Sequence, residues 1–169
     1  MQTGVGDVVQ SIFFFPKAPT ASGWIWGAGP VLLLLPTGWN DLLTTDKWGA
    51  GPMAVVLKQS NGWTRGMLAN HVWSFAGDDD RADVNATYLQ PFFTCTTPTH
   101  WAFGLNTEST YDWGAEQWSV PVNVTAPKLT RFGIQLVSLG GGVRYWADGP
   151  DGAPTGWGVR FTLTLLFAR

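Results

Sequence analysis

Hydrophobic residues occupy every second position in the last segment of the chain, residues 156–169. They are Trp157, Val159, Phe161, Leu163, Leu165 and Phe167. The positions between them hold Gly158, Arg160, Thr162, Thr164 and, as the one large apolar exception, Leu166. Side chains of a β-strand alternate between two faces with a period of two, whereas a helix would spread these residues around its axis. The pattern therefore predicts a strand with one hydrophobic and one polar face.

Turn-rich clusters divide the preceding chain into further segments of strand length. With the last segment, the predicted strands are 7–15, 24–35, 48–58, 64–75, 84–96, 101–113, 118–126, 136–146 and 156–169. Intervals of roughly 15 to 22 residues leave no room for crossover helices, so neighbouring strands should pair antiparallel. The sequence predicts an all-β fold, an antiparallel up-and-down meander.

The same alternation recurs in three of the other segments, whereas the first five are less regular. One face of each is hydrophobic: Trp101, Phe103, Leu105, Tyr111 and Trp113; then Trp118, Val120, Val122 and Val124; then Val137, Leu139, Val143 and Tyr145. The opposite face is mainly polar: Asn106, Glu108, Thr110 and Asp112; then Ser119, Asn123 and Thr125; then Ser138, Arg144, Trp146 and Asp148. These strands should form a sheet with two chemically different faces.

Glycine and proline interrupt the strands at defined places. The sequence Trp-Gly-Ala-Gly-Pro occurs at 26–30 and again at 48–52, and its glycines indicate close packing or a bend. Pro30, Pro52, Pro91 and Pro121 lack a backbone donor, so each should mark a bulge or a missing ladder hydrogen bond.

Composition restricts the function further. Of the 169 residues, 45% are hydrophobic and 13% charged, with 11 Trp and 10 Phe. The net charge of −2, with no run of Lys or Arg, gives no basic surface for nucleic acid. A single cysteine, Cys95, excludes an intramolecular disulfide. The longest apolar run, Val31–Leu35, is too short for a membrane-spanning helix.

The hydrophobic faces must contact either a protein core or lipid. A soluble all-β binding module would place them inside. Three features favour an outer-membrane barrel with apolar residues outside, and the first is charge on the polar strand faces. The second is tryptophan near strand ends, where it suits the membrane interface: Trp24, Trp48, Trp73, Trp101, Trp113, Trp118 and Trp157. The third is that two kinds of connection alternate. Connections 36–47, 77–83, 114–117 and 147–155 include the longest one and hold most of the acidic residues, whereas the others, such as 97–100 and 128–134, are generally shorter.

Four stretches of sequence carry a resemblance to a known family. They are Ala69–Arg81, Asn106–Trp113, Glu116–Pro121 and Gly142–Ala147. Across nearly the whole chain the sequence resembles a Gram-negative family of outer-membrane β-barrels that are labelled transporters, or are mislabelled neuromedin U. The family is related to outer-membrane proteins encoded beside phenol meta-degradation pathways.

The resemblance implies a fold, a location and partners. The chain is expected to form one transmembrane barrel domain, residues 1–169, with about eight to ten strands here. Family members are longer, with a signal peptide and further strands before the position that matches Gln2. The chain is therefore expected to be the carboxy-terminal part of a larger barrel, or else to close a smaller barrel of eight to ten strands. The expected location is the outer membrane, and the expected partners are its lipid and lipopolysaccharide, the barrel assembly machinery and a small-molecule solute. Residues 157–167 on the hydrophobic face should contact lipid. No cofactor and no enzymatic activity are predicted.

Charged residues on the polar faces are the main candidates for function: Glu108, Asp112, Arg144, Asp148 and Arg160. They could form a constriction that selects solutes by charge and size, or a salt-bridge network that only fills the barrel. The expected activity is passive passage of small solutes, including hydrophobic or aromatic ones. The alternative is a structural barrel that conducts nothing.

Two other groups are weaker candidates. The acidic residues Asp78, Asp79, Asp80 and Asp83 could bind a divalent cation or form a solvated loop, and their spacing does not match an EF-hand. His71 and His100 could pair with Ser74 or Ser109 for nucleophilic catalysis, but no nucleophile-elbow motif supports this.

Overall fold

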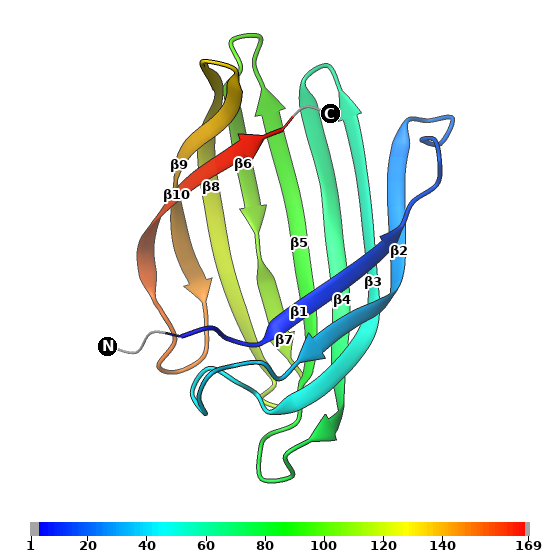
Figure 1. Ribbon diagram of the computed structural model, residues 1–169, viewed down its shortest axis with the longest axis vertical. Coiled ribbons are helices and arrows are strands. Elements are labelled where there is room, and N and C mark those ends of the chain that lie inside the picture. The colour runs from blue at the N-terminus through cyan, green and yellow to red at the C-terminus, as the bar shows by residue number, and fades with distance from the viewer. Residues whose placement is uncertain (1–3, 168–169) are drawn as a thin grey trace. The chain divides into compact units, whose positions relative to one another are not determined.

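In the computed structural model, residues 4–167 are described, apart from the side chains of residues 30–32. Strands account for all regular secondary structure in this part of the chain, which contains no helix long and apolar enough to cross a membrane. The strands are β1 (Val8–Phe14), β2 (Trp24–Leu35), β3 (Lys47–Ser60), β4 (Trp63–Gly77), β5 (Asn85–Thr96), β6 (Ala102–Thr107), β7 (Ser109–Asp112), β8 (Gln117–Phe132), β9 (Gln135–Asp148) and β10 (Gly156–Leu166) (Figure 1).

The strands pair in the order in which they occur in the chain. The order is β1-β2-β3-β4-β5-β6-β8-β9-β10, and the short β7 pairs with β5 and β8 beside this path. The registers of β1 with β2, β5 with β6, β6 with β8, β8 with β9 and β9 with β10 are all antiparallel. The predicted all-β class and the antiparallel meander are therefore confirmed.

Most predicted strands lie where the sequence places them, and β2 has the predicted limits. The predicted strand 101–113 is wrong in one respect, because it is divided into β6 and β7 at Glu108. Two of the four prolines lie at the predicted irregularities. Pro121 lies at a register shift in β8, and Pro30 lies where β1 and β2 shift register between Ile12 and Phe14.

The predicted end of the strand 118–126 is also wrong, because β8 continues to Phe132. Pro127 suggests a strand end, but it pairs with Gly140 of β9. A Cβ atom at Gly140 would lie 2.7 Å from the Cα of Pro127, so the glycine makes room for the proline ring. The turn predicted at 128–134 is thus reduced to Gly133 and Ile134.

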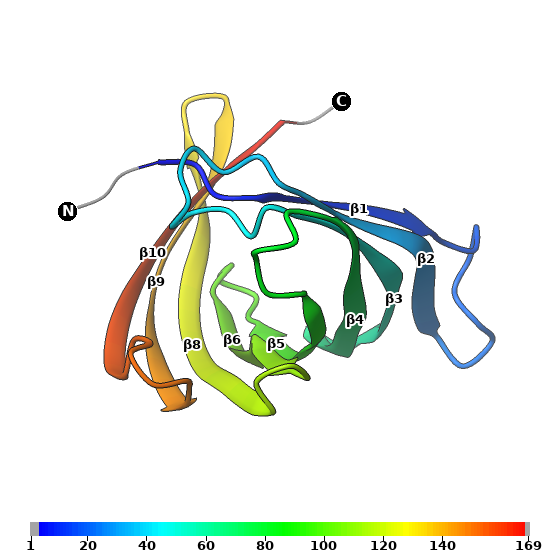
Figure 2. The same ribbon diagram turned by 90° about the horizontal axis from the view of Figure 1, so that it is seen from below.

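The described chain forms two compact units. The first takes in the chain up to Val56 with Leu68–Leu89 and Thr110–Gln117, and the second takes in Leu57–Met67, Gln90–Ser109 and the chain from Trp118 onward. In the second unit β8, β9 and β10 lie side by side (Figure 2).

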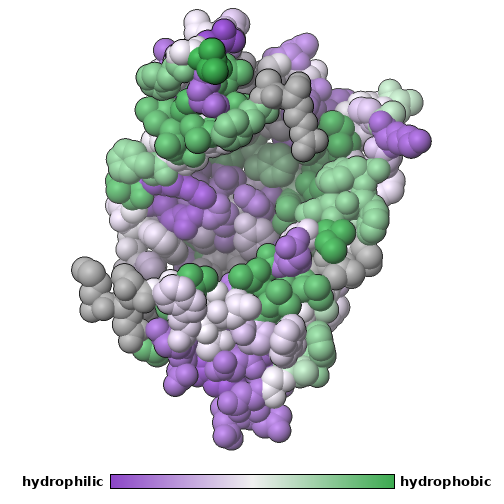
Figure 3. Space-filling model, viewed as in Figure 1, coloured by the Kyte–Doolittle hydropathy of each residue, from purple (hydrophilic) through white to green (hydrophobic). Residues whose placement is uncertain are grey.

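The hydrophobic face of the second unit is exposed. Its strands align one cross-strand row of apolar side chains: Phe93, Leu105, Val124, Val143 and Val159. These five side chains are between 42% and 78% exposed. Hydrophobic side chains also gather over β10 (Figure 3). The apolar face of this sheet therefore has no protein layer over it within the described residues.

The repeated Trp-Gly-Ala-Gly segment has the same geometry in both copies within the first unit. Trp26 and Trp48 are exposed, and each second glycine closely approaches the backbone of a neighbouring strand. A Cβ atom at Gly29 would lie 2.1 Å from the Ile12 carbonyl oxygen, and one at Gly51 would lie 1.7 Å from the His71 carbonyl oxygen. The close packing predicted for these glycines is confirmed, because no side chain fits at either position.

The connection between β2 and β3 is held by Asp7. Its Oδ1 accepts hydrogen bonds from the amides of Thr37 and Gly38, and its Oδ2 accepts from the amide and hydroxyl of Thr45. Burial raises the pKa of Asp7, but the hydrogen bonds, chiefly those from Thr45, outweigh burial and lower the pKa from 3.8 to about 2. The ionised carboxylate is therefore the form that fixes this connection.

Replacing Asp7 with asparagine should destabilise the fold by about 1–2 kcal/mol at pH 7, because charge-assisted hydrogen bonds are lost from a partly solvated site. Folding lowers the Asp7 pKa. The contribution of Asp7 to the free energy of unfolding is therefore fully present above pH 3.8 and is lost as the pH falls toward 2. Urea unfolding of both proteins at pH 7, 4 and 2 tests this. A difference that stays constant down to pH 2 would contradict the role of the ionised carboxylate.

Candidate functional site

The polar face of the second unit carries a cross-strand row of hydrogen-bonding side chains. Asn106 of β6 lies opposite Asn123 of β8, and Asn123 lies opposite Arg144 of β9. The Asn123 Nδ2 donates to Asn106 Oδ1 at 2.7 Å, and its Oδ1 accepts from Arg144 Nε at 2.6 Å. Asn123 is 1% exposed, and its side-chain amide both donates and accepts a hydrogen bond. It therefore fixes the orientation of the Arg144 side chain.

Glu108 is the carboxylate on which two arginines converge. Arg144 Nη2 donates to Glu108 Oε2, and Arg160 Nη1 donates to Glu108 Oε1 at 3.0 Å. Glu108 lies at the break between β6 and β7, where its amide donates to the Pro121 carbonyl at the register shift of β8. The interruption of the strand thus positions the carboxylate that unites this cluster, called here the Glu108 cluster (Glu108, Arg144, Arg160, Asn123 and Asn106).

Each of the two arginines lies opposite a glycine of the neighbouring strand. Gly158 lies opposite Arg144, and Gly142 lies opposite Arg160. A Cβ atom at Gly158 would lie 3.0 Å from the Trp146 ring. The Arg144 guanidinium lies 5.4 Å from the centroid of that same ring, within the range of a cation–π interaction. Arg144 is therefore held by a carboxylate, an amide and an aromatic ring.

The cluster is partly open to solvent and carries an excess of positive charge. The exposed fractions of the side chains are 21% for Glu108, 25% for Arg144 and 44% for Arg160. Two arginines share one carboxylate, so the formal charge is +1. Arg160, the most exposed member, is the group that a solute at this face would meet first, and an anionic or electron-rich solute is the favoured type.

The structure does not bring the other two charged candidates to the Glu108 cluster. Asp112 Oδ1 accepts from the amides of Gly114 and Ala115, and Asp148 Oδ1 accepts from the amide of Gly149. Both carboxylates stabilise the turns that follow their strands. Asn123 was not among the candidates derived from the sequence. Its partners depend on the strand register, and its polarity on an alternating strand was the only available signal.

The acidic connection between β4 and β5 forms ion pairs and hydrogen bonds with other residues of the first unit. Asp83 accepts from Ser74 Oγ and pairs with the buried Lys47 at 3.0 Å, and the bond from Lys47 chiefly lowers the pKa of Asp83. Arg81 pairs with Asp46 at 3.4 Å and donates to the carbonyl oxygens of Asp41 and Thr44. Across residues 4–167, no three His, Cys, Asp or Glu side chains come together as a metal site. Asp78, Asp79, Asp80 and Asp83 thus supply no such set.

His71 pairs with a threonine and not with Ser74 or Ser109. His71 Nδ1 lies 2.7 Å from Thr87 Oγ1, which also accepts from Trp113 Nε1. Ser74 bonds Asp83, and Ser109 Oγ donates to Thr107 Oγ1. The His71 Nε2 atom is buried and has no hydrogen-bond partner among the described residues. No histidine–serine pair is therefore formed in the described structure.

The residues expected to contact lipid are all exposed. Their exposed fractions are 74% for Trp157, 78% for Val159, 86% for Phe161, 64% for Leu163, 51% for Leu165 and 78% for Phe167.

The chain was compared with protein-family models, with curated proteins and with solved structures, and it matches none of them.

Proposed function

We propose that this chain forms part of an outer-membrane β-barrel that lets small solutes cross passively, with the Glu108 cluster facing the solute path. One observation carries the proposal: the second unit exposes its apolar face and partly buries its charged face. Soluble proteins rarely expose a large contiguous apolar surface, whereas membrane barrels have an apolar outer face that contacts lipid. The charged face then lines the interior.

The positive excess of the cluster defines what the channel would favour. Arg144 is oriented by Asn123, and Arg160 is the more exposed cation. Fixed guanidinium groups attract anions and stack on aromatic rings. The solutes proposed are therefore small and anionic or aromatic.

A closed barrel that conducts nothing is the second candidate. It is favoured by the arrangement of the cluster, in which both carboxylate oxygens of Glu108 are occupied by arginines. Such a network would fill and stiffen the interior instead of selecting solutes. Both candidates require insertion into lipid, and they differ in whether current flows.

Single-channel recording in planar bilayers tests the proposal. Replacing Arg144 and Arg160 together with glutamine removes two positive charges and should shift the ion preference from anions toward cations. Asp148→Asn serves as the control, because the Asp148 carboxylate accepts a hydrogen bond from the Gly149 amide in the turn after β9. Insertion without current would support the closed barrel. An unchanged conductance and ion preference in the double variant would remove the cluster from the solute path.

A further inference from the structure

The tight turn between β3 and β4 places two basic residues opposite each other on neighbouring strands. Asn61 and Gly62 have φ values of 51° and 80°, the positive pair that a two-residue type I′ hairpin requires. Such a turn pairs Ser60 with Trp63 and therefore Lys58 with Arg65. The Gln59 Nε2 donates to Thr64 Oγ1 at 3.4 Å, which agrees with the pairing of Gln59 with Thr64 in this register. Like charges directly opposite each other destabilise a strand pair, so an anion bound near both residues would be favoured.

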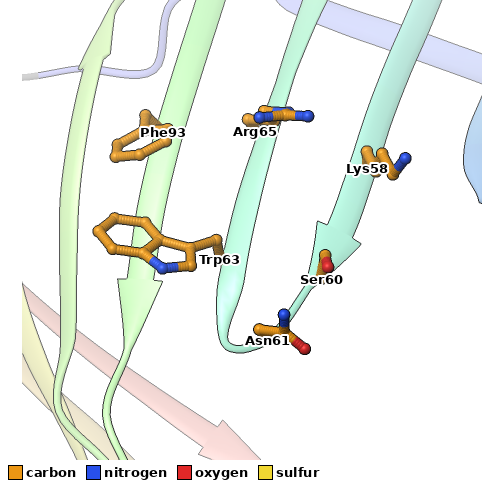
Figure 4. Close-up of a pocket in the computed structure, with 6 residues that line it drawn as sticks. All are labelled: Lys58, Ser60, Asn61, Trp63, Arg65 and Phe93. Atoms are coloured by element: carbon orange, nitrogen blue, oxygen red, sulfur yellow. The ribbon is translucent and has the colours of Figure 1, made fainter.

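These two cations line a pocket of about 410 Å³ on the second unit. Its lining residues are Lys58, Ser60, Asn61, Trp63, Arg65 and Phe93. Arg65 lies between Lys58 on β3 and Phe93 on β5 (Figure 4). The guanidinium group of Arg65 forms no hydrogen bond or ion pair with the side chains or backbone of residues 4–167. The pocket thus combines donors for an oxyanion with an aromatic wall.

The aromatic wall places the pocket on the apolar face. The rings of Trp63 and Phe93 are 4.9 Å apart, and Phe93 belongs to the exposed apolar row. Arg65 follows Trp63 by two positions and so points to the same face. Tryptophan and basic residues near strand ends, on a face turned to lipid, lie at the depth of the headgroups.

We infer that Lys58 and Arg65 bind the phosphate of an anionic phospholipid, with Trp63 and Phe93 against the adjoining acyl chain. The inference rests on the proposed function, because it needs the apolar face to contact a bilayer. Ser60 and Asn61 offer further donors at the turn. Short barrel turns face the periplasm, so the ligand is a phospholipid of that leaflet. The aromatic wall distinguishes this ligand from free phosphate, which would gain nothing from the rings.

The test compares thermal unfolding of the full chain in vesicles of phosphatidylcholine and in vesicles that also contain phosphatidylglycerol. Phosphatidylglycerol should raise the unfolding midpoint by about 2–4 °C, the response expected of a domain of this size to modest ligand stabilisation. The variant with Lys58→Gln and Arg65→Gln should lose this shift. Arg65→Lys, which keeps the charge, should retain most of it. The matched control is Arg131→Gln, a basic residue on the opposite face of β8, and it should retain the full shift.

Two further measurements separate the possible failures. Flotation of the vesicles shows whether the chain inserts; if it does not, both this inference and the proposed function are wrong. If the chain inserts but phosphatidylglycerol has no effect, only this inference is wrong. Inorganic phosphate added to phosphatidylcholine vesicles should give no shift. An equal shift with phosphate alone would make the pocket a general phosphate site and overturn its assignment to lipid.

Discussion

Replacing Glu108 with glutamine is expected to lower the free energy of unfolding by about 2–4 kcal/mol. The substitution keeps the size of the side chain but removes the charge that Arg144 and Arg160 share. Removing one partner of a buried ion pair costs about 3–5 kcal/mol, and the partial exposure of this cluster reduces that cost. Urea unfolding of the refolded chain measures the difference.

A double-mutant cycle distinguishes loss of the pair from loss of a single side chain. When Arg144→Gln is combined with Glu108→Gln, the total destabilisation should be less than the sum of the two single effects, because the second change relieves an unpaired charge. Asp112→Asn is the matched control, since the Asp112 carboxylate accepts hydrogen bonds from the turn amides of Gly114 and Ala115, and it should cost about 1 kcal/mol. Strict additivity would show that Glu108 and Arg144 do not depend on each other.

Replacing Gly51 with alanine is expected to cost about 2–3 kcal/mol. The new methyl group would lie 1.7 Å from the His71 carbonyl oxygen, so the two strands would have to separate. Overpacking of this kind costs about 1–3 kcal/mol, and a backbone atom yields less easily than a flexible side chain.

Gly141→Ala is the matched control for this substitution. Gly141 also lies within a strand, but a Cβ atom there would meet nothing within 4 Å. It should therefore be neutral or slightly stabilising. The same measurement, the midpoint and slope of urea unfolding, applies to both variants. Equal effects at Gly51 and Gly141 would contradict the close approach of β3 to the backbone at His71.

The sequence predicts most of the fold because alternation and turn residues act locally. The limits of β2 follow from Gly23 before it and Pro36 after it. The extension of β8 through Pro127 could not be predicted, because it depends on Gly140 in the facing strand. The break at Glu108 likewise depends on a register shift at Pro121. The residue pattern along one strand does not predict strand limits that depend on the residues of a facing strand.

The same distinction applies to the Glu108 cluster. Polarity on alternating positions correctly selects Glu108, Arg144 and Arg160 as members of one polar face. It also selects Asp112 and Asp148, which lie at strand ends and stabilise turns instead. Only the register shows that Asn123 lies between Asn106 and Arg144. The alternation of residue types thus predicts which face of the sheet a side chain lies on, whereas the strand register determines its hydrogen-bond partners.

The two-residue turns have a consequence for how the chain folds. Asn61–Gly62 joins β3 to β4, and Gly133–Ile134 joins β8 to β9 with glycine at the position that needs a positive φ. Hairpins of this kind form within about 1–10 μs because their closing entropy is small. Since each strand pairs mainly with its sequence neighbours, the two hairpins can serve as separate starting points. We expect the amides flanking both turns to gain protection from hydrogen exchange before those beside the long 36–46 connection.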